Sequence, residues 1–277
     1  MTLSIITINF NNVLGLKRTM RSVLEQNWKN YEWILIDGGS LDGSRQLIEH
    51  TYSVLQEDGD RNPITYYCSE QDSGIYNAMN KGLRHASGDY VMFLNSGDVF
   101  AANNVLSQVF FKTQCADVIY GDLCFVGKRK SKVFHYPSQL TFHYFFNRSL
   151  GHPASFIRRT LLEETGYRED FRIVSDWYAF LYWFQQGRTF QHVDVVVANF
   201  DAGGISLTDD ARHTEERERV FAELFRPEDR KWIEESIRMQ QMYEENVRYL
   251  DKMSGKEKVR GLRLVFLKLV SGLIRKI

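Results

Sequence analysis

The sequence predicts an α/β protein built on a Rossmann-like, mostly parallel sheet flanked by helices. Two observations carry this prediction. Short apolar, β-branched segments alternate with helical patterns over the first hundred residues, and polar clusters follow three of the apolar segments. Strands that alternate with helices form βαβ units, in which the strands run parallel. Sheets of this kind bind ligands beyond the carboxyl ends of their strands, and the polar clusters fall at those ends.

The elements of the first half follow in order along the chain. The predicted strands are residues 3–9, 31–36, 64–68 and 90–94. The predicted helices between them are residues 15–26, 42–55 and 76–85. The polar clusters are Asn9-Phe10-Asn11, Asp37-Gly38-Gly39-Ser40 and Asn95-Ser96-Gly97-Asp98.

After residue 101 the pattern becomes less regular. Short predicted strands are residues 117–120, 132–135, 154–157 and 193–199, and a strongly apolar helix is predicted over 176–186. The segment 209–251 is charged and helical, and 259–277 is helix-like with one apolar face. Aromatic residues gather in 142–184, where they could build either a core or a cleft that stacks on sugars.

The composition is typical of a globular protein. The chain has 277 residues and a mass of 32.5 kDa, with 43% hydrophobic and 25% charged residues, which argues against disorder. The three cysteines form no CxxC pair, which argues against a disulfide framework or a zinc site and fits a reducing cytosol. No stretch approaches the roughly 20 apolar residues that span a bilayer, and no leader pattern precedes the first strand. We therefore expect a cytoplasmic protein.

Charge is balanced over the whole chain but not along it. Lys and Arg number 35, as do Asp and Glu, so the formal net charge is zero. Residues 252–277 carry eight Lys or Arg against Glu257, a net charge of +7, so the remaining residues sum to −7. A basic tail on a mildly acidic body predicts an anionic partner for the tail alone. We expect no nucleic-acid partner.

Asp37 ends a hydrophobic strand and is the first candidate for ligand binding. An acid in this place can accept hydrogen bonds from a ribose hydroxyl or a base N–H. It could equally form a turn, since Asp-Gly is a common turn pair. Residues 9–15 contain no G-x-G-x-x-G, and no GxxxxGK[ST] occurs in the chain, so NAD and a P-loop are both disfavoured.

Three further acids have a functional and a plain structural interpretation. Asp72 or Ser73 could cap the helix that follows Gly74, on which Asn77 and Lys81 share a face, or could simply cap a surface helix.

Asp98 follows a buried strand, where a carboxylate can hold a divalent cation on a diphosphate, although N-S-G-D is also a good turn sequence. Asp176 lies in the first turn of a helix that Ser175 could cap, where the helix dipole favours an ionised carboxylate able to act as a general base. The alternative for Asp176 is an ordinary first-turn acid.

Taken in order, six segments resemble glycosyltransferase family 2, the inverting enzymes with the GT-A fold. They are SIITINFNN, EWILIDGGSLDGS, SEQDSGIYNAMNKG, VMFLNSGD, FRIVSDWYAF and FDAGGIS. The resemblance covers about residues 1–207 and is close to the branch that builds bacterial exopolysaccharide, capsule and O-antigen units, including colanic acid enzymes. Six weak motifs in the right order and spacing make it specific.

The resemblance implies roles for individual residues. The donor nucleotide-sugar site would include Thr7, Asn9, Asn11, Asp37, Ser40, Asp72, Gly74, Asn77, Lys81 and Asn95, with Asp37 reading the base. Asp98 would bind the metal, and Asp176 would be the catalytic base. Candidates on the acceptor or phosphate side are His152, Gly203, Gly204 and Ser206.

The chain departs from the family pattern at two motifs. Asn95 and Gly97 stand where the family's D-x-D motif has its acids, which leaves Asp98 as the single carboxylate. We therefore expect weak Mg²⁺ or Mn²⁺ binding that depends on the nucleotide, because Mg²⁺ usually keeps several waters. The family's E-D pair at the base is incomplete, with Ser175 before Asp176. No Q-x-x-R-W motif follows, which argues against a processive polymerase.

The resemblance implies an inverting transferase that uses a nucleotide-sugar donor, with UDP favoured by family analogy, and a glycan or lipid-linked acceptor. It divides the chain into a donor-binding half (1–100), an acceptor-binding and catalytic half (101–207) and a helical extension (208–277) whose basic tail (252–277) could lie on an anionic membrane. The alternatives are a catalytically weak partner subunit of another glycosyltransferase, a sugar nucleotidyltransferase, and an interaction protein built on 209–251.

Overall fold

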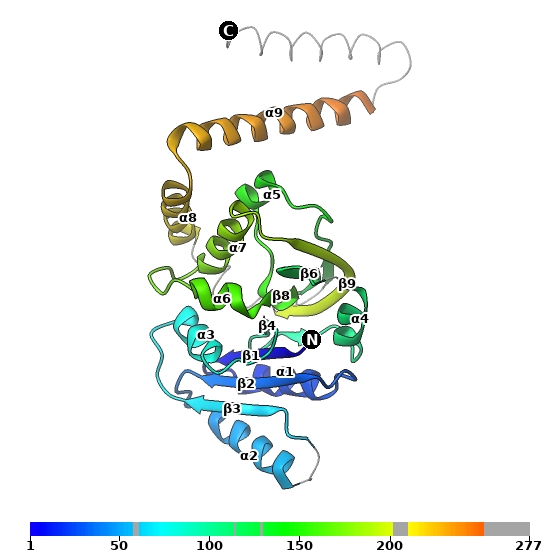
Figure 1. Ribbon diagram of the computed structural model, residues 1–277, viewed down its shortest axis with the longest axis vertical. Helices are drawn as coiled ribbons and strands as arrows, with labels where there is room; N and C mark the ends of the chain where they lie inside the picture. The colour runs from blue at the N-terminus through cyan, green and yellow to red at the C-terminus, as the bar shows by residue number, and fades with distance from the viewer. Residues whose placement is uncertain (58–60, 114, 128–129, 202–209, 252–277) are drawn as a thin grey trace. The chain divides into compact units, whose positions relative to one another are not determined.

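The computed structural model describes residues 1–57, 61–113, 115–127, 130–201 and 210–251. The chain forms two compact units, Met1–Val220 and Phe221–Ile277. The first unit contains the whole described sheet, and the described part of the second contains the end of one helix and all of another (Figure 1).

The observed elements agree closely with the predicted ones in the first half. The strands are β1 (Leu3–Asn9), β2 (Tyr31–Asp37), β3 (Ile64–Ser69), β4 (Tyr90–Phe93), β5 (Val99–Phe100), β6 (Val118–Val126), β7 (Ser131–Phe134), β8 (Ser155–Arg158) and β9 (Phe190–Asp201). The helices are α1 (Val13–Leu24), α2 (Ser44–Glu57), α3 (Ile75–Leu83), α4 (Val105–Lys112), α5 (Phe142–Asn147), a 3₁₀ turn η1 (His152–Ala154), α6 (Arg159–Thr165), α7 (Ser175–Gln185), α8 (Asp210–Leu224) and α9 (Pro227–Asp251). The pattern analysis missed β5, α4, α5 and α6, which are short.

The first four long strands form the parallel part of the sheet. The sheet order is β3-β2-β1-β4-β8-β6-β9-β5, with β7 paired to β6, and β1 pairs in parallel with both β2 and β4 (Figure 1). All seven residues of β1 are buried, as a strand covered on both faces requires. In register, Asn9 of β1 pairs with Asp37 of β2, so the polar residues that follow these strands meet at one edge of the sheet.

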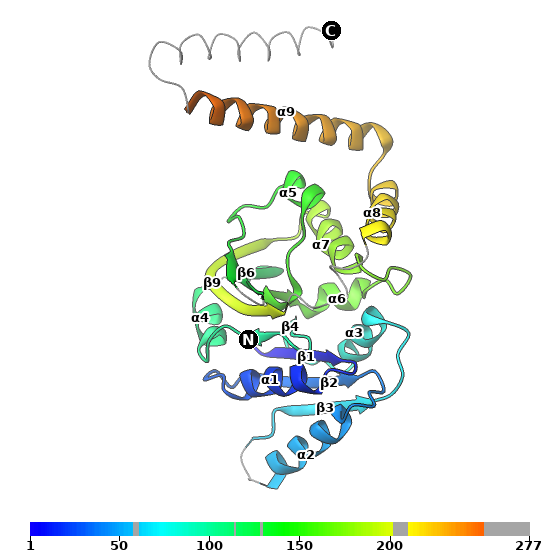
Figure 2. The ribbon, with the colours of Figure 1, turned by 180° about the vertical axis from the view of Figure 1, so that it is seen from behind.

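The second half of the sheet mixes directions. Strand β8 runs antiparallel to β4 and β6, whereas β6 and β9 run parallel with two register shifts around Asp122. Such bulges bend a strand and increase its twist, and β9 curves strongly in both views (Figures 1 and 2). Gly121 permits this bend, because a Cβ there would lie 2.6 Å from the backbone oxygen of Val195. The curved β9 carries its last residues back toward the loop after β4, where Asp201 meets Asp98.

The second unit is described only in part. Within it, the rings of Phe221 and Phe225 are tilted against each other with centroids 6.3 Å apart, and α9 carries exposed ion pairs one helical turn apart, such as Arg248 with Glu244. Exposed pairs of this kind contribute little stability. In the part of the chain that the structure describes, no helix is both long and apolar enough to cross a bilayer.

Candidate active site

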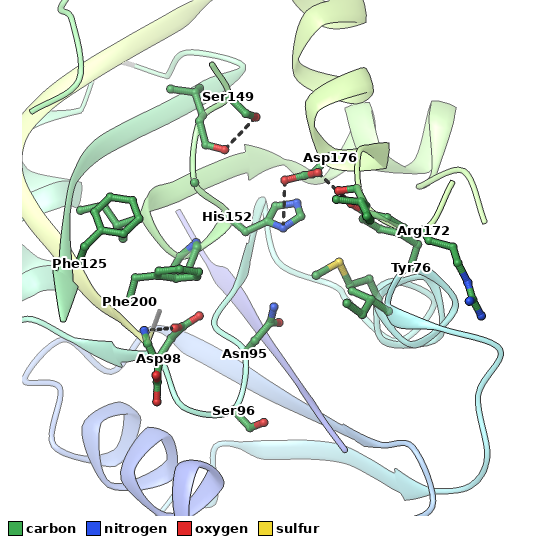
Figure 3. A pocket seen from close by; sticks show the side chains of 18 of the residues that line it. Tyr76, Asn95, Ser96, Asp98, Phe125, Ser149, His152, Arg172, Asp176 and Phe200 are labelled. Atoms are coloured by element: carbon green, nitrogen blue, oxygen red, sulfur yellow. Dashed lines mark hydrogen bonds and ion pairs between the residues drawn. The ribbon is translucent and has the colours of Figure 1, made fainter. Parts of the chain in front are cut away.

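A cavity of about 600 Å³ lies where the two halves of the sheet both contribute side chains (Figure 3). Its walls come from α3, the loop after β4, β6, η1, α7 and β9, and include Tyr76, Met79, Asn95, Ser96, Asp98, Leu123, Phe125, Tyr136, His152, Arg172, Asp176, Phe200 and Asp201. The fold therefore brings Asp98, His152 and Asp176, which are far apart in the sequence, to one cavity.

Asp176 stands in the first turn of α7, and its side chain is 22% exposed. The expectation that Ser175 caps this helix is wrong. The helix begins at Ser175 after Val174, and the buried Ser175 hydroxyl instead accepts a hydrogen bond from the backbone N–H of Arg168 at 2.6 Å.

A buried glutamate from α8 holds the loop that leads into α7. The carboxylate of Glu216 accepts hydrogen bonds from the backbone N–H groups of Arg172, Ile173 and Val174, at 2.8, 2.9 and 3.2 Å. Ionised carboxylates make strong hydrogen bonds to such N–H groups. Glu216 is 7% exposed. Its three hydrogen bonds fix the loop that carries Asp176 into the cavity.

Two side chains face the carboxylate of Asp176. The hydroxyl of Tyr76 lies 2.9 Å from Oδ1, and Nδ1 of His152 lies 3.8 Å from Oδ2 (Figure 3). Because no protein group donates a hydrogen bond to Oδ2 among the described residues, that oxygen is available to accept a proton from a ligand.

His152 is nearly enclosed, with 8% of its surface exposed. Its ring packs against the rings of Phe93 and Phe180, and its Nε2 lies 3.0 Å from the hydroxyl of Tyr167. Burial lowers the pKa of His152, and the charge of Asp176 opposes that shift only in part. A histidine with a lowered pKa is neutral at pH 7, so His152 is poorly suited to neutralising a phosphate.

The loop after β4 forms a second polar corner of the cavity. Gly97 adopts φ 108°, which favours glycine, and its N–H donates to the hydroxyl of Thr19 at 3.0 Å. Oδ1 of Asp98 accepts a hydrogen bond from the backbone N–H of Asp201 at 3.0 Å, and Asp201 pairs with Arg18 at 3.1 Å. Burial, together with the negative charge of Asp201, raises the pKa of Asp98 to about 7.

The donors at this corner suit a hard divalent cation but are few. Asp98 and Asp201 both line the cavity, and Oδ1 of Asn95 is buried and has no hydrogen-bond partner among the described residues. All are oxygen donors, which Mg²⁺ and Mn²⁺ prefer. No group of three or more His, Cys, Asp or Glu with metal-binding geometry exists among the described residues. The corner fits a cation only if a ligand supplies further oxygens.

Asp37 lies beneath the surface at the ends of β1 and β2 and is not among the residues that line the cavity. Its oxygens accept four hydrogen bonds: from the Asn9 amide at 2.7 Å, the Ser40 hydroxyl at 2.6 Å, the Ser40 backbone N–H at 2.9 Å and the Ser69 hydroxyl at 2.6 Å. Burial alone would raise the pKa of Asp37, but these hydrogen bonds outweigh it and leave the pKa below its usual value. Asp37 therefore organises the polar loop around it.

The other candidates from the first half lie near this loop or below it. Thr7 is fully buried, and its hydroxyl accepts a hydrogen bond from the Trp33 indole. Asn11 is exposed and bonds to the neighbouring loop, where its Oδ1 accepts a hydrogen bond from the backbone N–H of Leu41 at 2.9 Å. Oδ2 of Asp72 lies 2.6 Å from where a Cβ on Gly38 would stand, so the carboxylate covers this glycine.

The start of α3 differs from its predicted capping. Gly74 is the N-cap residue and has no side-chain cap, because Oδ1 of Asp72 bonds to the Gly74 N–H and not to the first helical turn. Gly74 and Asn77 line a second cavity of about 490 Å³. Lys81 pairs with Glu70 at 2.8 Å and does not line the first cavity.

Some predicted residues cannot be placed. Gly203, Gly204, Ser206 and the basic tail 252–277 lie outside the described residues.

Pattern analysis missed two residues that line the cavity and one that supports it. Tyr76 lies inside the S-G-I-Y-N motif, and Asp201 stands two residues before the predicted glycine pair. Glu216 carries no local signal, because a charged helix offers many equivalent acids.

Comparison with known proteins finds several glycosyltransferases among the relatives. The chain is 43% identical over 108 residues to an uncharacterized glycosyltransferase of Mycobacterium tuberculosis, covering 39% of this chain and 38% of that protein. It is 28% identical over 212 residues to the PGL/p-HBAD biosynthesis glycosyltransferase of Mycobacterium bovis, covering 74% and 79%. It is 32% identical over 143 residues to the putative teichuronic acid biosynthesis glycosyltransferase TuaG of Bacillus subtilis, covering 50% and 54%. The match to the first of these relatives thus spans under two fifths of that protein's length.

Solved structures share the fold. Residues 1–349 of S. aureus TarS in complex with UDP-GlcNAc superpose with a TM-score of 0.56 at 17% identity, covering 74% of this chain and 59% of that one. The mannosyltransferase PcManGT of Pyrobaculum calidifontis, in complex with GDP-Man and Mn²⁺, superposes with a TM-score of 0.58 at 14% identity, covering 98% and 80%. These confirm the predicted GT-A fold. The model of glycosyl transferase family 2 matches residues 4–166, more than half of the sequence, so the chain belongs to that family.

Proposed function

We propose that this glycosyltransferase inverts the configuration of the transferred sugar, with Asp176 as its general base. The observation that carries the proposal is the placement of Asp176 and Asp98 on one cavity, with Oδ2 of Asp176 open to a ligand. An acceptor hydroxyl gives its proton to Asp176 while its oxygen bonds to the anomeric carbon. The bond from that carbon to the nucleoside diphosphate breaks on the opposite face, and the diphosphate leaves with the electron pair.

The corner at Asp98 is the proposed place for the leaving diphosphate. When bound there, a divalent cation supplies positive charge against the charge that develops on the leaving group. Asp98, Asp201 and the unpartnered Oδ1 of Asn95 are the residues that would hold it. With so few protein donors, we expect binding to be weak and to require the nucleotide. Lys81 and His152 are weak candidates for neutralising the diphosphate, because Lys81 is paired with Glu70 and burial lowers the pKa of His152.

The proposed donor is a UDP-sugar held by the first hundred residues. The network of Asp37, Asn9 and Ser40 shapes the loop where the base would lie, and the related fold of TarS is found in complex with UDP-GlcNAc. The GDP-mannose complex of PcManGT makes a guanosine donor the main competitor. A thermal-shift screen of UDP-, GDP- and dTDP-sugars, with and without Mn²⁺, separates them. Stabilisation by UDP-sugars alone supports the proposal, whereas stabilisation by GDP-sugars alone contradicts the choice of base.

The proposed acceptor is a glycan or lipid-linked hydroxyl in bacterial surface polysaccharide synthesis, bound mainly by residues 101–207. The relatives named for teichuronic acid and PGL/p-HBAD biosynthesis support this class. The cavity wall at Phe125 and Phe200 offers half-buried rings for the apolar faces of a sugar.

We also propose that the basic segment 252–277 binds anionic membrane, at about 1 kcal/mol for each Lys or Arg near the surface. The test is co-sedimentation with phosphatidylglycerol vesicles, comparing the full chain with residues 1–251. Equal sedimentation of both contradicts this role of the tail.

Substitution of Asp176 by Asn tests the proposed base. We expect turnover to fall by about 10²–10⁴, the usual contribution of a general base, while UDP affinity stays unchanged. Near-normal turnover in this variant would remove Asp176 from the mechanism. If the unaltered protein binds a nucleotide-sugar but releases no nucleoside diphosphate, with or without added acceptor, the alternative of a catalytically weak partner subunit is favoured. The raised pKa of Asp98 and the reduced metal motif are what motivate that alternative.

A further inference from the structure

Tyr167 stands behind His152 and does not line the cavity. Its hydroxyl lies 3.0 Å from Nε2 of His152 and makes no other hydrogen bond among the described residues. The side chain is 4% exposed, so water cannot readily take the place of His152. A buried hydroxyl must donate its proton to a partner, so Tyr167 donates to Nε2.

This hydrogen bond decides where the proton of the His152 ring lies. In a neutral imidazole one nitrogen is a donor and the other an acceptor. With Nε2 accepting from Tyr167, the ring proton is on Nδ1, which faces Oδ2 of Asp176 at 3.8 Å. The other tautomer would turn a lone pair toward the carboxylate and leave the Tyr167 hydroxyl without an acceptor. Both neighbours of the ring therefore favour the same tautomer.

The surroundings hold this arrangement in place. The backbone of Tyr167 makes two hydrogen bonds to the side chain of Asn80, at 2.9 and 2.7 Å. Asn80 lies one turn after Tyr76 on α3, so a single helix positions both the tyrosine that bonds Asp176 and the tyrosine that bonds His152. Rings of Phe93 and Phe180 pack against the imidazole and limit its rotation.

We propose that Tyr167 is a positioning residue for the transfer reaction: it holds His152 in the Nδ1–H tautomer, so that an N–H dipole faces Oδ2 of Asp176 and keeps this carboxylate oriented. The inference rests on the proposed function, since it takes Asp176 as the base. A partner that fixes the tautomer of a histidine beside a reacting group can control catalysis without touching the substrate.

The first test reads the tautomer directly and needs no substrate. Long-range ¹H–¹⁵N correlation spectra of the full chain distinguish Nδ1–H from Nε2–H imidazoles, and loss of one signal in His152→Asn assigns the ring among the seven histidines. We expect His152 to be Nδ1–H in the unaltered protein and to change tautomer, or to mix the two, in Tyr167→Phe. An Nε2–H signal in the unaltered protein would overturn the proposal.

The second test reads the consequence in turnover, with UDP release from UDP-glucose as the probe and water as the acceptor. We expect Tyr167→Phe to lower kcat about tenfold with unchanged KM, as the loss of one positioning hydrogen bond would. The matched control is Tyr90→Phe, which removes the hydroxyl of another buried tyrosine, one that is bonded to Ala116 and Arg158 and lies away from the cavity. Unchanged kcat in Tyr167→Phe, or an equal loss in Tyr90→Phe, would overturn the positioning role.

Two His152 variants keep the test decisive even if Tyr167→Phe folds poorly. The amide nitrogen of Asn can take the place of Nδ1, whereas that of Gln reaches the place of Nε2. We expect His152→Asn to keep more of kcat than His152→Gln, and Tyr167→Phe to have no further effect on kcat in the Asn background. The opposite order overturns the proposal. Near-normal turnover in Asp176→Asn would instead contradict the role of Asp176 as the base. The tautomer of His152 read from the spectrum would be unaffected by that result.

Discussion

The hydroxyl of Tyr76 lies 2.9 Å from Oδ1 of Asp176 and 2.6 Å from the backbone oxygen of Ile173. One side chain of α3 therefore holds both the proposed base and the loop before it, although about a hundred residues separate them. Burial and the charge of Asp176 raise the pKa of Tyr76 far above its usual value, so its hydroxyl stays protonated and remains a donor. Its single proton can go to either acceptor.

Removal of that hydroxyl tests the contact. We expect Tyr76→Phe to lower kcat about tenfold, because Asp176 loses the hydrogen bond that orients it, and to leave the Kd for UDP within about twofold. Steady-state kinetics and calorimetry measure the two quantities. A large rise in the Kd for UDP with unchanged kcat would place Tyr76 in nucleotide binding and not beside the base.

The corner of the cavity at Asp98 gives a prediction about Mn²⁺. In Asp98→Asn we expect UDP to bind equally with and without Mn²⁺, whereas Mn²⁺ strengthens UDP binding to the unaltered protein, because Asp98 is the one acid left in the motif. Asp194→Asn is the matched control, since Asp194 is an exposed acid on the same strand as Asp201. Calorimetric titrations of UDP at fixed Mn²⁺ measure the effect. A retained response to Mn²⁺ in Asp98→Asn would exclude Asp98 as a ligand.

Asp37 is expected to act through the loop that it organises. In Asp37→Ala the side chains of Asn9, Ser40 and Ser69 lose their shared acceptor, so we expect at least about a tenfold rise in the Kd for UDP together with a lower Tm. Asp37→Asn keeps the shape of the side chain and some of its acceptor capacity. We expect its Kd for UDP to lie between those of the unaltered protein and Asp37→Ala. Unchanged UDP affinity in Asp37→Ala would remove this network from the donor site.

Glu216 gives a prediction about stability. Its replacement by Ala leaves the N–H groups of Arg172, Ile173 and Val174 without their acceptor, and we expect a loss of about 2–4 kcal/mol in the free energy of unfolding. Glu215→Ala is the control, because Glu215 is the exposed neighbour on the same helix. Urea unfolding of both variants makes the comparison. Equal stability of the two variants would mean that the hydrogen bonds from Glu216 to the loop before α7 contribute nothing measurable.

His152 predicts a pH dependence of stability. Burial lowers its folded pKa below the unfolded value of 6.5, so only the unfolded chain takes up this proton just below pH 6.5. Stability is therefore lost as pH falls below that value, by up to about 1.4 kcal/mol per pH unit until the folded pKa is reached. Between about pH 7 and about pH 5, the unaltered protein should lose more stability than His152→Asn. Titratable groups that both proteins share contribute almost equally to both pH dependences and largely cancel in the difference. If the free energy of unfolding changed with pH in parallel in the two proteins, the lowered pKa of His152 would be contradicted.

Local pattern was sufficient for the parallel half of the fold. The apolar runs that became β1, β2 and β4 predicted buried strands, because a strand covered on both faces must be apolar along its whole length. The polar residues after them predicted a ligand-binding edge. Short elements such as β5 were not predicted, because two residues are too few to show a periodic pattern.

Several residues of the site were decided only by tertiary structure. Asp201 reaches Asp98 because bulges beside Gly121 bend β9, and Tyr167 reaches His152 because α3 anchors its backbone. Glu216 holds a loop that lies some forty residues earlier in the chain. Such contacts depend on how elements pack, and packing joins residues whose separation along the chain has no fixed period. The sequence by itself determined which polar residues follow the strands, and the folded chain determined which of them share a cavity and which support it from behind.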